Sequence, residues 1–285
     1  MPINYLDEER VDIIVRNAIL EDLATLDVTT PATVPFTLQG RAKFLAKQDG
    51  VLAGMQFAFY AFKMLEPRAK LNALVEDGQA FSKGTIVAEV SASVRTLLMA
   101  ERVALNFLQR LCATATLTRK FVEAVDGTGA VILDTRKTTP GLRDMEKYAV
   151  RCGGGTNHRR DLSTMAMIKD NHREALEKSE RSLADGVAEI RRRSPDVQVE
   201  IEVDSLNQLE DALAGNPEWI LLDNMAVPDM REAVRIVGGR AKLEASGGVT
   251  LETVRAIAET GVDAISVGAL THSAGALDIS LDLEF

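Results

Sequence analysis

A basic stretch, Asp134–Arg173, carries the residues of this chain that are best suited to chemistry. It holds nine lysines and arginines against five acidic residues, although the whole chain has a formal net charge of −9. Two of the three histidines, His158 and His172, also lie in it. Cations gathered with histidines and glycines inside an acidic protein predict a pocket for a multiply charged anion. The alternative is a solvated basic loop and helix, which the irregular spacing of the charges disfavours.

The composition excludes several classes of protein. With 285 residues, of which 46% are hydrophobic, the chain is long enough for one large or two ordinary domains. The negative net charge argues against nucleic acid as the main partner. No apolar run is long enough to span a bilayer, and Met1–Arg10 lacks a signal-peptide core, so we expect a cytoplasmic protein without a membrane partner. Cys112 and Cys152 fit no zinc spacing and no disulfide framework, so we expect buried, reduced thiols.

The first part of the chain mixes helices and strands without a repeating unit, which is typical of an α+β domain. Apolar residues at helical spacing predict helices over Glu8–Leu23 and Gly54–Leu65. Ser93–Val125 has a longer helical pattern, which fits one long helix or two abutting helices and a hinge between domains. The expected strands are Arg41–Leu45, Val51–Gly54, Leu71–Val75 and Thr85–Val90.

From Ala130 onward, apolar strand patterns alternate with helical patterns. This alternation predicts a parallel sheet, and its apolar strands favour an α/β barrel, incomplete and with about six to seven strands. A doubly wound open sheet is the alternative, although no G-x-G-x-x-G motif follows the first strand. The expected strands are Ala130–Leu133, Met165–Ile168, Val197–Val203, Glu218–Leu222, Ala241–Glu244 and Ala264–Val267. The expected helices are Asp144–Cys152, Arg173–Arg193, Ser205–Ala214, Val227–Val237 and Leu251–Thr260.

Polar residues follow these expected strands at the point where each strand ends. In a parallel barrel the active site gathers at the C-terminal ends of the strands, so we expect these side chains to meet. Glu200 and Glu202 lie on one face of their strand, because side chains alternate. Taken singly, Asp204 or Asp223 would serve equally well as a helix cap. The residues at the strand ends are Asp134, Arg136, Lys137, Lys169, Asp170, Asp204, Asp223, Asn224, Glu244 and Ser246.

Two loops of small residues follow the last two expected strands, at Ser246–Gly248 and at Gly268-Ala269. Barrel enzymes often bind phosphate at this position through backbone N–H groups. The alternative is a pair of tight turns without a ligand. Glu202 and Asp223 are suited to hold sugar hydroxyls, or Mg²⁺ that phosphates carry. The residues therefore predict a site with a phosphate end, an acidic middle and a basic end that suits a compact polycarboxylate.

Nine segments, in order along essentially the whole chain, match one known pattern. They are Asp27–Thr30, Glu101–Asn106, Thr135–Gly141, Asn157–Arg159, Ile168–His172, Glu202–Ser205, Leu222–Asn224, Ser246–Gly248 and Val267–His272. Together they resemble the quinolinate phosphoribosyltransferase family, and in particular the bacterial decarboxylating enzymes that make nicotinate mononucleotide for NAD synthesis. The joint match is specific, because it involves many separate motifs.

The resemblance implies a fold, an assembly and a reaction. An α+β N-terminal domain would cover residues 1–112, an α/β barrel would cover 113–275, and the final segment, 276–285, would return to the first domain. A homodimer with shared active sites is implied, in which each barrel faces the partner's N-terminal domain. The implied reaction is Mg²⁺-dependent transfer of phosphoribosyl from phosphoribosyl pyrophosphate to quinolinate, with loss of CO₂.

The resemblance also implies a role for each site residue. Arg102 would enter the site from the neighbouring subunit, and Glu202 and Asp223 would lie near the ribose hydroxyls and Mg²⁺. The residues around the carboxylates of quinolinate would be Arg136, Lys137, His158, Arg159 and Lys169. The residues around the 5′-phosphate would be Ser246, Gly247, Gly248, Gly268 and His272. We expect catalytic roles for Lys137, Lys169, Glu202 and Asp223, with the two lysines as candidates for protonating the carbanion that decarboxylation leaves.

Departures from the family pattern are few. Leu26 stands where Gly is common, Cys112-Ala113 replaces Ser-Gly, and Arg160-Asp161 occupies positions that are usually small or apolar. Within the fold, the alternatives are a molybdenum-associated relative and a nicotinate-using transferase. From other classes, the alternatives are a Schiff-base aldolase with Lys169 as the nucleophile and an anion-binding protein without activity.

Overall fold

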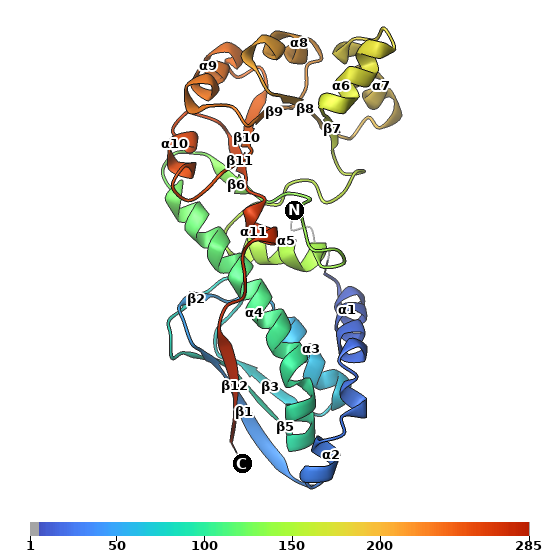
Figure 1. The fold of residues 1–285 in the computed structure, drawn as a ribbon, viewed down its shortest axis with the longest axis vertical. Coiled ribbons are helices and arrows are strands. Elements are labelled where there is room, and N and C mark those ends of the chain that lie inside the picture. The colour runs from blue at the N-terminus through green and yellow to red at the C-terminus, as the bar shows by residue number, and fades with distance from the viewer. Residues whose placement is uncertain (1–5, 285) are drawn as a thin grey trace. The chain divides into compact units, whose positions relative to one another are not determined.

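A computed structural model describes residues 6–284 of the chain. The chain divides into two compact units, each built from more than one segment. Unit 1 comprises Met1–Arg119, Thr138–Gly154 and Leu270–Phe285, and unit 2 comprises Lys120–Lys137 and Gly155–Ala269. Each unit contains its own sheet, shown in Figure 1.

Unit 1 contains a four-stranded antiparallel sheet with the strand order β12-β1-β5-β3. Its C-terminal strand β12 lies at the edge beside β1, so that Lys43 faces Asp282 across the pair. A separate pair, β2 with β4, is also antiparallel. The bounds of these strands are Gln39–Ala46 (β1), Gly50–Val51 (β2), Lys70–Ala73 (β3), Ala80–Phe81 (β4), Ile86–Ser93 (β5) and Ile279–Glu284 (β12).

One long helix, α4 (Val94–Ala124), supplies much of the core of unit 1. It is a single helix of 31 residues, which settles the choice that the sequence left open between one helix and two. Leu97, Leu108 and Leu111 on α4 are fully buried together with aromatic side chains of the sheet and of α3. The other helices are α1 (Glu8–Glu21), η1 (Ala24–Leu26), α2 (Thr30–Thr33), α3 (Met55–Leu65) and α5 (Arg143–Cys152).

Gly54 marks a close approach between the start of α3 and helix α4. Its φ of +91° is one that glycine adopts without strain, and a Cβ there would lie 2.4 Å from Leu111 Cδ1. Its N–H donates to Asp77 Oδ2 at 2.7 Å, so that this carboxylate satisfies a backbone donor at the helix N-terminus. The sequence therefore needs glycine at this position both for conformation and for space.

Unit 2 contains a six-stranded parallel sheet with the order β6-β11-β10-β9-β8-β7. All six strands expected from the sequence form, which confirms the predicted parallel architecture. The sheet runs as an arc from β6 to β7 with α8, α9 and α10 outside it (Figure 1), and within residues 6–284 no ladder joins β6 directly to β7. The strands are Val131–Leu133 (β6), Ala166–Ile168 (β7), Val199–Val203 (β8), Trp219–Asp223 (β9), Lys242–Ser246 (β10) and Ala264–Ser266 (β11).

The helices of unit 2 correct one expectation. The prediction of a single helical segment over Arg173–Arg193 is wrong, because Glu180 has a φ of +55° and Ser182 caps a new helix by accepting from Asp185 N–H at 3.1 Å. The two helices that form are α6 (Asp170–Lys178) and α7 (Leu183–Arg193). The others are η2 (Leu206–Gln208), α8 (Leu209–Ala214), α9 (Val227–Val237) and α10 (Val254–Ala258), and α11 (Ala269–His272) begins at the last residue of unit 2.

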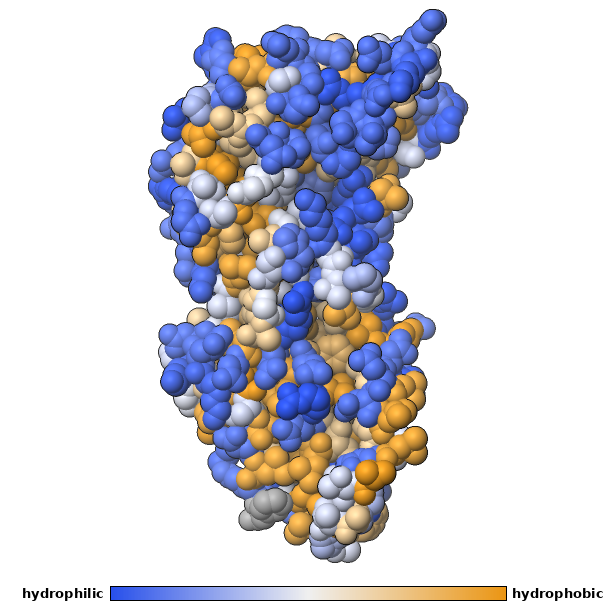
Figure 2. Space-filling view, viewed as in Figure 1, coloured by the Kyte–Doolittle hydropathy of each residue, from blue (hydrophilic) through white to orange (hydrophobic). Residues whose placement is uncertain are grey.

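Across the part of the chain that the structure describes, no helix combines the length and apolarity that a membrane crossing requires. Both cysteines are free thiols, as the sequence predicted, but the predicted burial holds only for Cys112, because Cys152 is half-buried. Burial raises the pKa of Cys152 to about 12, which makes its thiol unreactive at neutral pH. Figure 2 shows hydrophobic side chains at the surface among hydrophilic ones.

Candidate active site

A pocket of about 360 Å³ lies at the carboxyl ends of the strands of unit 2. Residues at the ends of all six strands line it, which is the arrangement expected when parallel strands end at one edge. The lining residues are Asp134, Thr135, Arg136, Lys137, His158, Arg159, Met167, Lys169, Glu202, Leu221, Asp223, Glu244, Ser246 and Ser266. A larger cavity of about 640 Å³ shares Arg136, Arg159, Met167 and Lys169 with it.

The basic side of the pocket is formed by Arg136 and Lys137 after β6, by Arg159 before β7 and by Lys169 after β7. Two contacts with the segment around β7 position the guanidinium of Arg159. Nη1 donates to Met165 O at 3.1 Å, and Nη2 lies 3.4 Å from Met167 Sδ. Burial and the neighbouring charge of Arg136 both lower the pKa of Arg159. Two neighbouring guanidinium groups can bind one anion together, and planar carboxylates suit their geometry.

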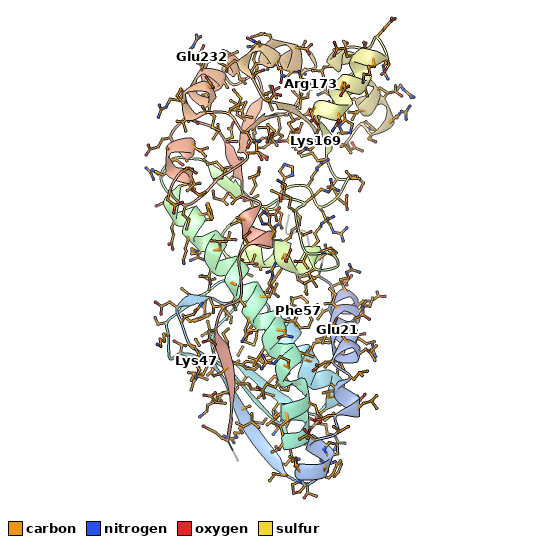
Figure 3. The ribbon with its side chains drawn as sticks, in the orientation of Figure 1. Glu21, Lys47, Phe57, Lys169, Arg173 and Glu232 are labelled. Atoms are coloured by element: carbon orange, nitrogen blue, oxygen red, sulfur yellow. The ribbon has the colours of Figure 1, made fainter. Side chains whose placement is uncertain are left out.

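Lys169 and Glu202 form an ion pair in the pocket, between Nζ and Oε2. Lys169 is less buried than Glu202, with 42% of its side chain exposed against 13%. Figure 3 labels Lys169 at the end of β7, and Arg173 one turn further along α6. Arg173 Nη1 donates to the backbone oxygen of Glu202 at 3.4 Å, so that α6 also contacts the end of β8. A basic and an acidic residue of the predicted site therefore neutralise each other in this structure.

Below the cations lies a buried group of one histidine and two carboxylates. His158 Nε2 lies 3.2 Å from Glu200 Oε2 and 3.1 Å from Glu244 Oε2, and both carboxylates are almost fully buried. Burial raises the pKa of Glu200 to about 7. Burial disfavours a charged His158, but the two carboxylates outweigh that effect and raise its pKa. Asp134, also fully buried, accepts from His158 N–H at 2.9 Å and from Asn157 Nδ2 at 2.6 Å.

The loops that follow β9 and β10 are packed tightly together. Asn224 N–H donates to Ser246 O at 2.9 Å, and Asn224 Nδ2 donates to Asp223 Oδ2 at 2.9 Å. Gly247 has a φ of +95°, and a Cβ on it would lie 2.1 Å from Asn224 Oδ1. Gly248 also has a positive φ, but a Cβ there would meet nothing within 4 Å. Packing against Asn224 thus explains why position 247 is a glycine, whereas Gly248 has open space beside its backbone.

Two sets of residues in unit 2 are suited to hold a metal. Glu202 and Asp223 both line the pocket and offer carboxylate oxygens, so in kind they fit a hard cation such as Mg²⁺ that also binds substrate phosphates. His158, Glu200 and Glu244 present three ligand atoms within 4.8 Å of one another. That second set contains an imidazole nitrogen, which suits Zn²⁺ or Mn²⁺ better than Mg²⁺.

The structure brings most of the predicted site residues together. Arg136, Lys137, His158, Arg159, Lys169, Glu202, Asp223 and Ser246 all line the pocket. Gly247, Gly248 and Gly268 lie in the loops that follow β10 and β11, outside the lining. Arg102 and His272 belong to unit 1, on α4 and α11. The sequence predicted Glu244 at the edge where the strands end and Glu200 on one face of its strand, but it predicted no role for either residue.

Two family models match the chain in succession. "Quinolinate phosphoribosyl transferase, N-terminal domain" matches residues 27–112, and "Quinolinate phosphoribosyl transferase, C-terminal domain" matches residues 114–282. The fold and the matched domains define a phosphoribosyl transferase. The chain belongs to the quinolinate phosphoribosyl transferase family, as its motifs predicted.

Relatives with curated names and solved structures agree with this assignment. The Mycobacterium leprae "Nicotinate-nucleotide pyrophosphorylase [carboxylating]" is 45% identical over 275 residues, covering 94% of this chain and 95% of the relative. The chloroplastic protein of the same name from Arabidopsis thaliana is 41% identical over 287 residues, covering 95% and 82%. The structure of the nicotinate-nucleotide pyrophosphorylase from Francisella tularensis has a TM-score of 0.92 and 36% identity, covering 99% of each chain.

Proposed function

We propose that the protein transfers the phosphoribosyl group of phosphoribosyl pyrophosphate to quinolinate and releases CO₂, pyrophosphate and nicotinate mononucleotide, as a step of NAD biosynthesis. Membership of the quinolinate phosphoribosyl transferase family supports the reaction. The observation that carries it is the single pocket in which four cations and two accessible carboxylates meet at the strand ends. The four cations of the pocket can bind a dicarboxylate, and its two accessible carboxylates can stabilise a cationic sugar centre.

Quinolinate occupies the basic side of the pocket in this proposal. Arg136 and Arg159 bind its carboxylates through their planar guanidinium groups, and Lys137 and Lys169 add point charges. The enclosure of Arg159 beside Arg136 supports this arrangement, because a bound anion relieves the repulsion between the two groups. His158 lies at the floor of the same region. These residues act mainly by binding the ring and orienting its nitrogen toward the sugar.

Phosphoribosyl pyrophosphate occupies the acidic side and the glycine loops. Glu202 and Asp223 hold ribose hydroxyls, and Ser246, Gly247, Gly248, Gly268 and His272 surround the 5′-phosphate. The open space beside Gly248 supports a phosphate at that loop. When bound at Glu202 and Asp223, Mg²⁺ would neutralise pyrophosphate as a leaving group.

The order of bond changes follows from the chemistry of the ring. The pyridine nitrogen attacks the anomeric carbon as the bond to pyrophosphate breaks, and the sugar is cationic in the transition state. Glu202 and Asp223 stabilise that charge as well as positioning the ribose. The ring nitrogen becomes quaternary and positive, so it stabilises the carbanion left when the 2-carboxylate departs as CO₂. Lys137 and Lys169, which both line the pocket, are the candidates for returning a proton to that carbon.

A homodimer completes the site in this proposal, with Arg102 of each subunit reaching the pocket of its partner. Exposed apolar side chains in the first segment of unit 1 support an interface, because monomers rarely expose many of them together. Val28 is 86% exposed and Phe36 is 79% exposed. The other exposed large apolar side chains in the described part of this segment are Ile13, Leu20, Leu23, Leu26, Leu38, Leu74 and Leu98.

A cytoplasmic location also remains a prediction. Plant relatives carry the words chloroplastic or mitochondrial in their names, whereas the name of the Mycobacterium leprae relative gives no compartment. Cell fractionation with detection by antibody tests the location.

The test of the reaction is direct. Purified protein is incubated with Mg²⁺, phosphoribosyl pyrophosphate and either quinolinate or nicotinate, and the nucleotide products are identified by mass spectrometry. We expect nicotinate mononucleotide from quinolinate and much less from nicotinate, because nicotinate lacks one of the two carboxylates. Product formed equally well from nicotinate would refute the choice of substrate. A matched sample without Mg²⁺, prepared with a chelator, tests the metal requirement.

A further inference from the structure

The buried group formed by His158, Glu200 and Glu244 has a feature that the reaction does not explain. Both carboxylates are at most 2% exposed, although Glu244 belongs to the residues that line the pocket. Burying two carboxylates is costly unless they are paired, and here both lie 3.1–3.2 Å from the same ring nitrogen, while neither oxygen of Glu200 makes any other hydrogen bond within residues 6–284. Their strands are different, since Glu200 lies on β8 and Glu244 on β10. Two strands each bury a carboxylate against this imidazole despite the free-energy cost of removing the charges from water. This arrangement indicates a specific role for the imidazole.

The ring of His158 is engaged on both of its nitrogens. Nε2 faces the two carboxylates, and Nδ1 accepts the backbone N–H of Arg159 at 2.7 Å. An accepting Nδ1 carries no proton, so this arrangement requires the proton to be on Nε2. The two carboxylates favour a second ring proton, but that proton would have to sit on Nδ1, where it would break the hydrogen bond that the Arg159 N–H makes at 2.7 Å. The carboxylates and the Arg159 amide therefore fix both the orientation and the tautomer of the ring.

We propose that Glu200 and Glu244 are positioning residues for quinolinate binding, which hold His158 through Nε2 so that Nδ1 fixes the backbone of Arg159. His158 then contributes to quinolinate binding through the position of Arg159. The guanidinium end of Arg159 is held separately by Met165 O and Met167 Sδ, so the residue is fixed at its backbone and at its tip. A preorganised guanidinium binds a carboxylate without the entropy cost of ordering a long side chain. This inference rests on the proposed function for its substrate.

A metal site is the competing interpretation of the same three residues. Their ligand atoms are close enough for one ion, and histidine with two carboxylates is a common set for transition metals. A cation there would replace the proton on Nε2, and it would sit beside Arg159, whose positive charge opposes it. The hydrogen bond from Arg159 N–H to Nδ1 can form whether Nε2 carries a proton or a metal ion. An experiment must therefore distinguish the two.

Nitrogen NMR of the histidine side chains tests the proposal on the unsubstituted protein. The chain has three histidines, so His158 can be assigned by comparison with a His158→Gln sample. At neutral pH we expect Nε2 of His158 to be protonated and Nδ1 to be unprotonated. Saturating quinolinate alone, without the second substrate, should leave that pattern unchanged. Two protonated ring nitrogens, or a proton that moves when quinolinate binds, would overturn the proposal.

Zn²⁺ addition to the same sample tests the metal interpretation, because Zn²⁺ is diamagnetic and changes the ring signals only where it coordinates the ring. With no substrate present, Zn²⁺ at millimolar concentration should leave Nε2 of His158 protonated. Loss of the Nε2 proton with a shift of that nitrogen signal would identify a metal site and overturn the proposal. Quinolinate binding is checked in parallel by calorimetry, so that a failure of the proposed substrate is recognised separately from a failure of the proposed tautomer.

Kinetics of Glu200→Gln and Glu244→Gln provide the functional test. Each variant weakens the hold on His158, so the KM for quinolinate should rise about 10-fold, the scale of a hydrogen bond to a charged group. The KM for phosphoribosyl pyrophosphate and kcat should change less than about 3-fold, because the contacts of Glu200 and Glu244 with His158 affect only the position of Arg159. Glu232→Gln, on the exposed surface of α9, is the matched control. Equal rises in both KM values, or no rise in either, would contradict the proposal even if one variant failed to fold.

Discussion

Lys169 Nζ and Glu202 Oε2 are paired with each other in the pocket, although one is placed to bind quinolinate and the other to bind the ribose. While this pair is closed, each charge is engaged by the other, so both proposed contacts are weakened. A dicarboxylate that attracts Lys169 therefore releases Glu202 for the second substrate. Because linkage is reciprocal, each substrate should strengthen the binding of the other.

Calorimetry with phthalate measures this coupling without turnover, because phthalate has two adjacent carboxylates but no ring nitrogen to react. We expect saturating phthalate to tighten the binding of Mg²⁺–phosphoribosyl pyrophosphate at least about fivefold, which is the lower end of typical coupling energies. The Lys169→Met variant should show little coupling. Lys178→Met, which removes an exposed ion pair with Glu174, is the matched control and should behave as the unsubstituted protein. Coupling that persists in Lys169→Met would contradict the account.

The Arg136→Ala variant tests the basic side of the pocket. Loss of a charged hydrogen-bond donor should weaken quinolinate binding about 10- to 100-fold, whereas the affinity for phosphoribosyl pyrophosphate should change less than about 3-fold. Isothermal calorimetry with each substrate alone measures both constants. Arg235→Ala, which removes an exposed arginine paired with Glu232 on α9, controls for the loss of a positive charge. An equal loss for both substrates would disprove the assignment of Arg136 to quinolinate.

Subunit mixing tests whether the site is shared. The Arg102→Ala and Arg159→Ala variants should each be nearly inactive, because each lacks one cation of every site. Mixed dimers contain one site with both arginines intact, so exchange of subunits should restore part of the activity. Subunit exchange is verified independently with two affinity tags. Confirmed exchange without recovery of activity would show that Arg102 does not act in the partner's pocket.

Alanine substitutions at two glycines with nearly the same φ distinguish the cost of backbone strain from the cost of steric crowding. Gly54 and Gly84 have φ values of +91° and +89°, but a Cβ would clash with Leu111 only at Gly54. Gly84→Ala should lower the free energy of unfolding by about 1 kcal/mol, from backbone strain alone. Gly54→Ala should cost about 2–4 kcal/mol, because overpacking adds to the strain. Chemical denaturation measures both, and equal losses would show that the α3–α4 contact adapts to a methyl group.

The sequence predicted the lining of the pocket well, for a physical reason. Parallel strands end at a common edge, so Arg136, Lys169, Glu202 and Asp223 meet although they are distant in the chain. The strands themselves were recognised because buried parallel strands are short apolar runs between helical patterns. The geometry of the site thus follows from local patterns together with one rule of topology.

Other features could not be read from local patterns. Glu200 and Glu244 are acidic residues, which are usually exposed, and only the fold reveals that both are buried against His158. Helix α5 was recognised as a helix, but a helical pattern does not say which sheet it packs against, and the fold groups it with unit 1. The break between α6 and α7 did have a signal, because Ser182 and Asp185 have the spacing of a capping box.

Isotopic labelling tests the central claim most directly. Quinolinate labelled with ¹³C in its 2-carboxylate is incubated with the protein, Mg²⁺ and phosphoribosyl pyrophosphate, and both CO₂ and the nucleotide are analysed by mass spectrometry. The account predicts that all of the label leaves as CO₂, that the nucleotide carries none, and that no CO₂ appears without phosphoribosyl pyrophosphate. Label retained in the nucleotide, or CO₂ released from quinolinate alone, would contradict a reaction in which transfer precedes and drives decarboxylation.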